Sequence, residues 1–293
     1  MTRPLVLDFD GSVDGLPGVD VVPLRHWQES IRFGASTAAM RDLAADIPSV
    51  AAPLVFLGSG DFHHVSYLLI ERLRVTGKPL QVVVFDNHPD NMRYPFGIHC
   101  GSWVWHVSRL PFVTSVHVLG ITSSDVEGRH LWENHLGPLY SARLRYWCVG
   151  PDLRAMRRVG IRHSHSFQSA GDLLDRFTAE CRTWNEPVYL SIDKDVLAPS
   201  VVRTNWDQGV MTMEELEHGI EAVRSSVVAS DVTGEVSSYR FKGLWKRLLV
   251  SLDGQPEVPE ALLSEWQERH RAIDQRLLSL LAPATSASTA QIR

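Results

Sequence analysis

The chain has 293 residues, of which 44% are hydrophobic and 22% charged, and its formal net charge is −5. This composition is typical of a globular protein and excludes long disorder, collagen-like repeats and a coiled coil as the main architecture. The acidic balance gives no indication of a nucleic-acid or anionic-membrane surface.

Short β-branched runs alternate with longer amphipathic stretches along the chain. The pattern predicts, in order, strands at 4–9 and 53–57, a helix at 63–75, a strand at 80–86, a helix at 102–110, strands at 115–121 and 144–149, a helix at 167–184, a strand at 187–193, a helix at 212–224, a strand at 227–232, and helices at 245–252 and 259–281. Such alternation predicts a parallel sheet with helices on both faces. We expect one domain over residues 1–281 and a disordered tail over 282–293.

Acidic clusters follow two of the most apolar predicted strands. Asp86, His88 and Asp90 come after one strand, and Asp193 and Asp195 come after another. In an open α/β sheet, ligands bind outside the carboxyl ends of the strands, and alternate residues of an extended segment point to one side. Four carboxylates in one crevice repel each other unless they are neutralised, and two divalent cations would supply the balancing charge.

Oxygen ligands with a few imidazoles suit Mn²⁺ best, and Zn²⁺, Fe²⁺ or Co²⁺ less well. A site for one metal or for none remains an alternative to the predicted pair of Mn²⁺ ions. For each cluster taken alone, a polar loop without function is a reasonable interpretation.

Three further segments carry candidate site residues. The adjacent His63 and His64 follow a glycine-containing turn, His99 lies on a glycine-flanked loop, and Glu235 follows the strand at 227–232. A histidine near metals can act as a proton shuttle, and a buried carboxylate can bind a planar cation. Taken alone, His99 could equally be a loop histidine without a role, and Glu235 a residue of a surface turn.

Together these motifs resemble the ureohydrolase superfamily of arginase, agmatinase and formiminoglutamase, over about residues 54–236. The resemblance implies a single-domain, three-layer α/β/α fold with a mostly parallel central sheet of about eight strands. It also implies one metal held by His63 (or, as the fallback, His64), Asp86, Asp90 and Asp193, and a second held by His88, Asp86, Asp193 and Asp195.

The resemblance further implies a function and a set of catalytic residues. The expected enzyme is a hydrolase that cleaves a C–N bond of a linear amidine or guanidino substrate through a metal-bridging hydroxide and releases urea and an amine. Asp90 would orient the hydroxide, His99 would deliver a proton to the leaving amine, and Glu235 would hold the guanidinium-like group. The expected substrate contacts are Asn91, Asp125, Thr204, Trp206 and Glu235.

The sequence departs from the family pattern where substrates are bound. Ser123 stands where arginases carry an acid, Asn87 replaces the usual Ala, and the loop Thr204–Gly209 reads TNWDQG. The expected partner is therefore an arginine- or agmatine-like molecule, a formimino compound or an arginine-containing peptide. Relatives are often homo-oligomers, so self-association is left open.

The apolar runs and the cysteines bear on where the protein is located. No apolar run approaches the roughly 18–20 residues of a membrane span, so no membrane partner is expected. The three cysteines lie far apart and suit a reducing compartment, so we expect a cytoplasmic location.

The sequence leaves three other functions open. One is a zinc deacetylase-like amide hydrolase of the same superfamily. Another is a haloacid-dehalogenase-like phosphatase, because Asp8, Asp10, Gly11 and Ser12 resemble its nucleophile motif. The last is a non-catalytic binding module on the same fold.

Overall fold

The computed structural model describes residues 3–49, 52–243 and 258–282. Its strands are β1 (Leu5–Asp8), β2 (Asp20–Pro23), β3 (Gly34–Ala35), β4 (Leu54–Ser59), β5 (Leu80–Phe85), β6 (Ile98–His99), β7 (Val113–Ile121), β8 (Leu144–Val149), β9 (His165–Phe167), β10 (Val188–Asp193) and β11 (Val227–Glu235). The α-helices are α1 (Gln28–Ile31), α2 (Thr37–Asp46), α3 (Ser66–Arg72), α4 (Trp103–Ser108), α5 (Leu136–Tyr140), α6 (Arg154–Arg158), α7 (Ala170–Cys181), α8 (Met213–Val223) and α10 (Glu260–Leu281). Short 3-10 helices include Gly60–Val65, Cys100–Ser102, Ser124–Val126, Leu131–Glu133 and Lys194–Val196.

Nine strands form one sheet in the order β2-β1-β4-β11-β10-β5-β7-β8-β9. Every neighbouring pair in it is parallel. A separate antiparallel pair joins β3 to β6. The expected parallel α/β fold is confirmed, with the short edge strands β2 and β9 in addition to the seven strands that the sequence predicts.

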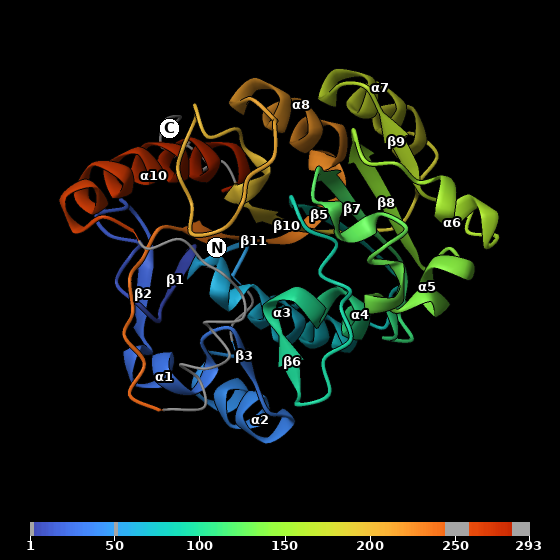
Figure 1. Ribbon diagram of the computed structural model, residues 1–293. Helices are drawn as coiled ribbons and strands as arrows, with labels where there is room; N and C mark the ends of the chain where they lie inside the picture. The colour runs from blue at the N-terminus through green and yellow to red at the C-terminus, as the bar shows by residue number, and fades with distance from the viewer. Residues whose placement is uncertain (1–2, 50–51, 244–257, 283–293) are drawn as a thin grey trace, which may run out of the picture.

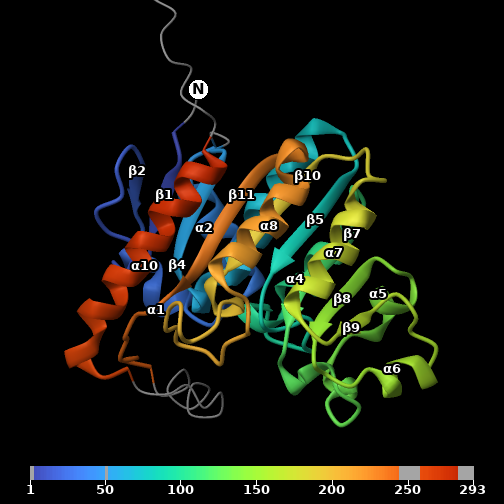
Figure 2. The ribbon, with the colours of Figure 1, turned by 90° about the horizontal axis from the view of Figure 1, so that it is seen from above.

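Helices cover both faces of the sheet (Figures 1 and 2). Alternate side chains of the central strands enter the two hydrophobic cores: Val82 and Val84 of β5 join one core, and Val83 and Phe85 join the other. The first core contains side chains of α2, α3 and α4, and the second contains side chains of α7, α8 and α10. This is the three-layer arrangement that continuous apolar strands require, because both of their faces must be buried.

Helix starts are fixed by local capping. Thr212 and Glu215 form a reciprocal capping box at the start of α8, and Ser169 accepts a hydrogen bond from the backbone N–H of Asp172 in α7. The predicted helix at 245–252 and the tail beyond 282 lie outside the described residues.

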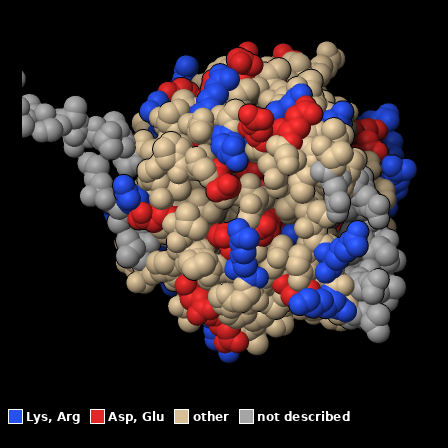
Figure 3. All heavy atoms as spheres, turned by 90° about the vertical axis from the view of Figure 1, so that its left-hand side faces the viewer, with Lys and Arg blue, Asp and Glu red and all other residues tan. Residues whose placement is uncertain are grey.

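The surface is mixed in charge. The face that carries β2 and α10 shows acidic and basic side chains interspersed, without a large field of one sign (Figure 3). Among the described residues, no helix has the length and apolar character needed to cross a membrane.

Candidate metal centre

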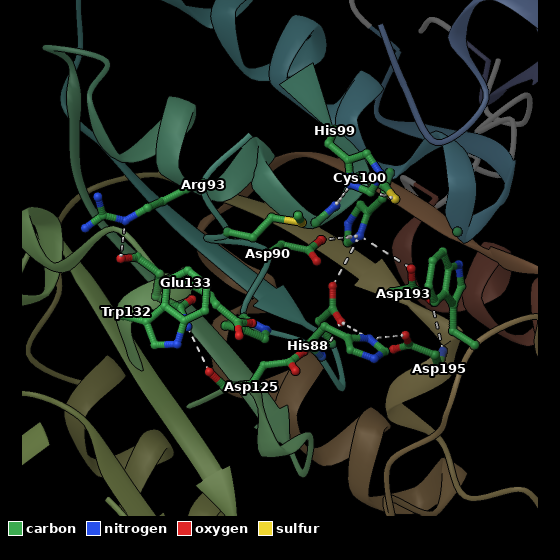
Figure 4. Close-up of a pocket in the computed structure, with 18 residues that line it drawn as sticks. His88, Asp90, Arg93, His99, Cys100, Asp125, Trp132, Glu133, Asp193 and Asp195 are labelled. Atoms are coloured by element: carbon green, nitrogen blue, oxygen red, sulfur yellow. Dashed lines mark hydrogen bonds and ion pairs between the residues drawn. The ribbon is translucent and has the colours of Figure 1, made fainter. Parts of the chain in front are cut away.

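Six acidic and imidazole side chains meet at the carboxyl edge of the sheet (Figure 4). The segments that carry them follow β4, β5 and β10, which lie close together in the strand order. His63 lies in the 3-10 helix after β4, Asp86 directly follows β5, and Asp193 is the last residue of β10. Residues 107 positions apart, such as His88 and Asp195, are therefore in contact.

The first cluster surrounds one imidazole nitrogen. The Nδ1 atom of His63 lies 3.2 Å from Asp86, 3.3 Å from Asp90 and 3.4 Å from Asp193. All four side chains are almost fully buried. The structure thus places His63 in the cluster, whereas His64 is buried outside the pocket lining.

The second cluster shares a carboxylate with the first. The Nδ1 atom of His88 lies 2.9 Å from Asp195 and 3.6 Å from Asp86. In each cluster, one potential ligand atom per residue lies within 4.8 Å of the others, and Asp86 belongs to both sets. The geometry provides two adjacent candidate cation positions.

The Asp86–Asp90 segment is a turn, which differs from the extended chain expected from alternation. The backbone N–H of His88 donates to Asp86 Oδ1 at 2.6 Å, and Asp90 has a left-handed φ of 45°. Trp103 Nε1 donates to Asp90 Oδ2 at 2.6 Å and fixes that carboxylate. The three side chains still converge because this turn redirects the backbone.

Charge and burial shift the ionisation of the first cluster. Burial lowers the pKa of His63, but its hydrogen bonds to Asp86 and Asp90 and the charge of Asp193 raise that pKa well above its ordinary value. Burial and the charge of Asp86 raise the pKa of Asp90 to about 7. Although burial opposes it, hydrogen bonding from His63 and His88 lowers the pKa of Asp86.

Burial and charge shift the pKa values of the second cluster in the same way. Burial and the charge of Asp86 raise the pKa of Asp195 to about 6. Burial lowers the pKa of His88, but the charge of Asp195 and hydrogen bonds to Asp195, Asp207 and Asp86 raise it well above its ordinary value. The pocket therefore holds protons that cations could displace.

The residues fit divalent cations. The Oδ2 atom of Asp86 is buried and lies 3.2 Å from His63 Nδ1, inside the first cluster. Within the described parts of the chain, none of the four carboxylates forms an ion pair with Lys or Arg. Oxygen-rich ligands with two imidazoles suit hard or borderline divalent ions.

Both histidines are held at their far nitrogen. His63 Nε2 lies 2.9 Å from Ser191 Oγ, which donates to Asp231 at 2.7 Å. His88 Nε2 lies 2.8 Å from Asp207 Oδ1. Such outer partners fix the ring orientation of metal-binding histidines. The sequence reasoning missed the contribution of Ser191 and Asp207, because nothing in a linear pattern pairs them with a histidine over 100 residues away.

The clusters line a cavity of about 420 Å³ that also contains other expected site residues. His99, Asp125 and Trp206 line it, together with Arg93 and Trp132 (Figure 4). In a neutral ring, the proton of His99 would reside on Nε2, because Nδ1 accepts a hydrogen bond from the backbone N–H of Gly101 at 3.0 Å.

Three expected substrate contacts do not line this cavity. Asn91 is buried and donates to Tyr146 at 2.7 Å and to the carbonyl of His135 at 3.0 Å. The hydroxyl of Thr204 donates to the carbonyl of Trp206 at 3.0 Å, within its own loop. These two side chains are engaged in holding local structure.

Glu235 is the third expected substrate contact that does not line the cavity. Its carboxylate binds Lys194 and lies 3.3 Å from His270, in a buried network that includes Asp274. Gly234 has a φ of 91° and marks a register shift between β11 and β4. One extra residue in a strand turns the following side chain to the opposite face, which explains why Glu235 points away from the pocket.

The two acids of the phosphatase-like motif are structural. Asp8 pairs with Arg25 at 2.8 Å. Asp10 is buried, lies 3.8 Å from Arg32 and accepts a hydrogen bond from Ser237 at 2.7 Å. Neither lines the cavity that holds the clusters.

A parallel α/β sheet with paired carboxylate–imidazole clusters at its carboxyl edge fits a metal-dependent α/β enzyme. The family model described as Arginase family matches residues 19–239, and the chain belongs to this family. It is accordingly a metal-dependent hydrolase of C–N bonds, and the phosphatase alternative is wrong.

The chain is also similar to individual proteins, and the solved structures among them share its fold. A Thermotoga maritima protein described as uncharacterized is 27% identical over 219 residues, covering 74% of this chain and 71% of its own. Proclavaminate amidino hydrolase from Streptomyces clavuligerus shares the fold with a TM-score of 0.52 and 16% identity, covering 92% of this chain and 91% of its own. Arginase from Bacillus caldovelox gives a TM-score of 0.52 and 16% identity, covering 88% and 100%.

Proposed function

We propose that the protein is a two-cation hydrolase that cleaves a C–N bond of a guanidino or related amidine substrate and releases an amine together with urea from a guanidino group or formamide from a formimino group. The observation that carries this proposal is the pair of ligand clusters that share Asp86. A site for a single cation would need only one of these two clusters. Four carboxylates in one buried pocket also match the charge of two divalent ions.

The first cation would be held by His63, Asp86, Asp90 and Asp193, and the second by Asp86, His88, Asp193 and Asp195. Mn²⁺ is the favoured ion, because the donor set is rich in carboxylate oxygens and contains two imidazoles. When bound, such ions lower the pKa of water toward 7, which makes a nucleophile available at neutral pH.

The remaining pocket residues would handle substrate and protons. Trp103 fixes the Asp90 carboxylate, to which we assign the orientation of the attacking water. His99 would supply a proton from Nε2 to the leaving amine, because an unprotonated amine leaves poorly. Asp125 and Trp206 line the cavity and would contact the substrate.

Metal quantification followed by a substrate screen tests the proposal. The protein, loaded with Mn²⁺, is assayed for release of urea from free arginine, agmatine and arginine-containing peptides and for release of formamide from formimino compounds. We expect about two metal equivalents and turnover of at least one compound. The variant Asp86→Asn should lose both the bound metal and the turnover. Wild-type protein with fewer than two equivalents, or metal-loaded protein that releases neither product from any of these compounds, would contradict the proposal.

A separate variant tests the role of His99. His99→Asn retains a side-chain acceptor for the Gly101 N–H but cannot carry the transferred proton. We expect unchanged metal content and a rate reduced about 10²–10⁴-fold, the usual contribution of general acid catalysis. A wild-type rate in this variant would remove His99 from the mechanism.

A further inference from the structure

We propose that Asp207 is a positioning residue that holds His88 for the second cation and links the pocket-lining loop Thr204–Gly209 to the metal centre. This inference rests on the proposed two-cation function. It concerns a residue that lies outside both ligand clusters and that the family motifs do not include.

The contacts of Asp207 are directed at the Asp86–Asp90 turn. Its Oδ1 lies 2.8 Å from His88 Nε2, opposite the Nδ1 atom that faces Asp195. Asn87 Nδ2 donates to the Asp207 carbonyl at 3.1 Å and to its Oδ2 at 3.2 Å. Asp207 therefore fixes both the ring of His88 and the backbone turn that presents it.

Two departures from the family pattern meet in this contact. Asn87 stands where the family carries Ala, and Asp207 belongs to a loop that differs from the usual one. The Asn87 side chain also accepts hydrogen bonds from the Thr122 hydroxyl at 2.5 Å and from its N–H at 3.2 Å. The two unusual residues thus form one connected support for the second cluster.

The outer partners of His63 and His88 come from different parts of the fold. Ser191 and Asp231, which support His63, are fully buried in the sheet. The Asp207 side chain is 70% exposed and comes from a loop. The His63 ring is thus fixed by the fold, whereas the orientation of His88 depends on the conformation of residues 204–209.

That loop also lines the cavity. Trp206 lines the pocket, and its Nε1 donates to Asp61 at 3.1 Å. Gln208 anchors the loop by donating to the carbonyls of Leu197 at 3.0 Å and Val202 at 2.9 Å. Because Trp206 and Asp207 are adjacent, one loop contacts both the cavity and the far nitrogen of His88.

The test measures metal binding rather than turnover. Removing an outer partner of a metal-binding histidine typically costs about 10–100-fold in metal affinity. We expect Asp207→Ala to weaken binding of one Mn²⁺ by that factor and to leave the other unchanged in calorimetric titrations. Asp207→Asn keeps an acceptor oxygen, so its affinity for that Mn²⁺ ion should fall less than the affinity of Asp207→Ala does.

Glu133→Gln is the control for charge, because it removes one negative charge from the lining of the cavity at a side chain that pairs with His130 rather than with His88. It should bind both ions as the wild type does. Metal-free Asp207→Ala should unfold at the wild-type temperature, because an exposed side chain contributes little to stability.

The outcomes separate this inference from the proposed function. Wild-type protein that binds fewer than two ions contradicts the two-cation proposal. Wild-type protein that binds two ions, with Asp207→Ala binding both equally tightly, overturns the role of Asp207 alone. Equal losses in Asp207→Ala and Glu133→Gln would reduce the effect to general electrostatic attraction and would also overturn it.

Discussion

The four buried carboxylates of the pocket are neutralised by two imidazoles and by protons that they retain. Asp90 and Asp195 illustrate this, since burial and the charge of Asp86 raise their pKa values to about 7 and about 6. His63 and His88 are held in the protonated form by the surrounding acids. A cation that enters must displace these protons, because metal ligands bind in their deprotonated form.

We therefore expect Mn²⁺ affinity to fall as the pH decreases from 8 to 6, because protons compete with the cation for His63 and His88 and, below about pH 7, for Asp90 and then Asp195 as well. Each proton released on binding changes the affinity about tenfold per pH unit. Calorimetric titration at pH 8, 7 and 6, in buffers with different ionisation enthalpies, measures both the affinity and the protons released. An affinity that is constant over this range would contradict the assigned ionisation states.

Single residues also show what could be predicted from the sequence. The two acidic motifs and His63 were predictable, because parallel strands bring their carboxyl ends to one edge. Asp207 could not be assigned, because its partner lies 119 residues away and its loop has no periodic pattern. The pocket position expected for Glu235 was not found, because the extra residue Gly234 reverses the side to which the next side chain points.

At the scale of elements, Lys194 joins three parts of the fold behind the metal centre. It lies in the 3-10 helix after β10 and is fully buried. Its Nζ binds Glu235 at the end of β11 and Asp274 of α10, the latter at 2.6 Å. A buried charge that loses its partner is costly, because it can be neither hydrated nor paired.

Lys194→Met should destabilise the protein by about 3–5 kcal/mol, the usual cost of breaking a buried ion pair by removing one partner. Urea unfolding of the metal-free protein measures this free energy. Arg276→Met, which removes an ion pair with the partly exposed Glu217, is the control and should cost less than about 1 kcal/mol. Similar losses in the two variants would show that the Lys194 network contributes no more than a surface pair.

Most elements that the sequence missed share a physical cause, and the ten-residue helix α2 is an exception. The edge strands β2 and β9 and the helices α1, α5 and α6 contain only three to five residues each. Such segments are too short to show a helical or strand period, and tertiary contacts rather than local preference form them. The central strands were predictable because they are continuous apolar runs buried on both faces.

At the scale of the whole molecule, the metal centre connects segments spread over about half of the chain. His63 and Asp86 follow two strands of the sheet, Asp193 ends a third strand, and Asp207 contributes from a separate loop. The clusters exist only when these segments are folded together, so a cation that binds them binds the native state. Binding energy then adds directly to the free energy of unfolding.

Mn²⁺ at about 100 times its dissociation constant should therefore stabilise the protein by about 2.7 kcal/mol per bound ion. For a chain of this size, each kcal/mol raises the unfolding midpoint by roughly 2–4 °C. Calorimetric scans with Mn²⁺ and with excess chelator measure this shift. Asp86→Asn, which alters the ligand shared by both clusters, should show almost no response to the ion. An equal increase in this variant would show that the stabilising ions bind elsewhere on the protein.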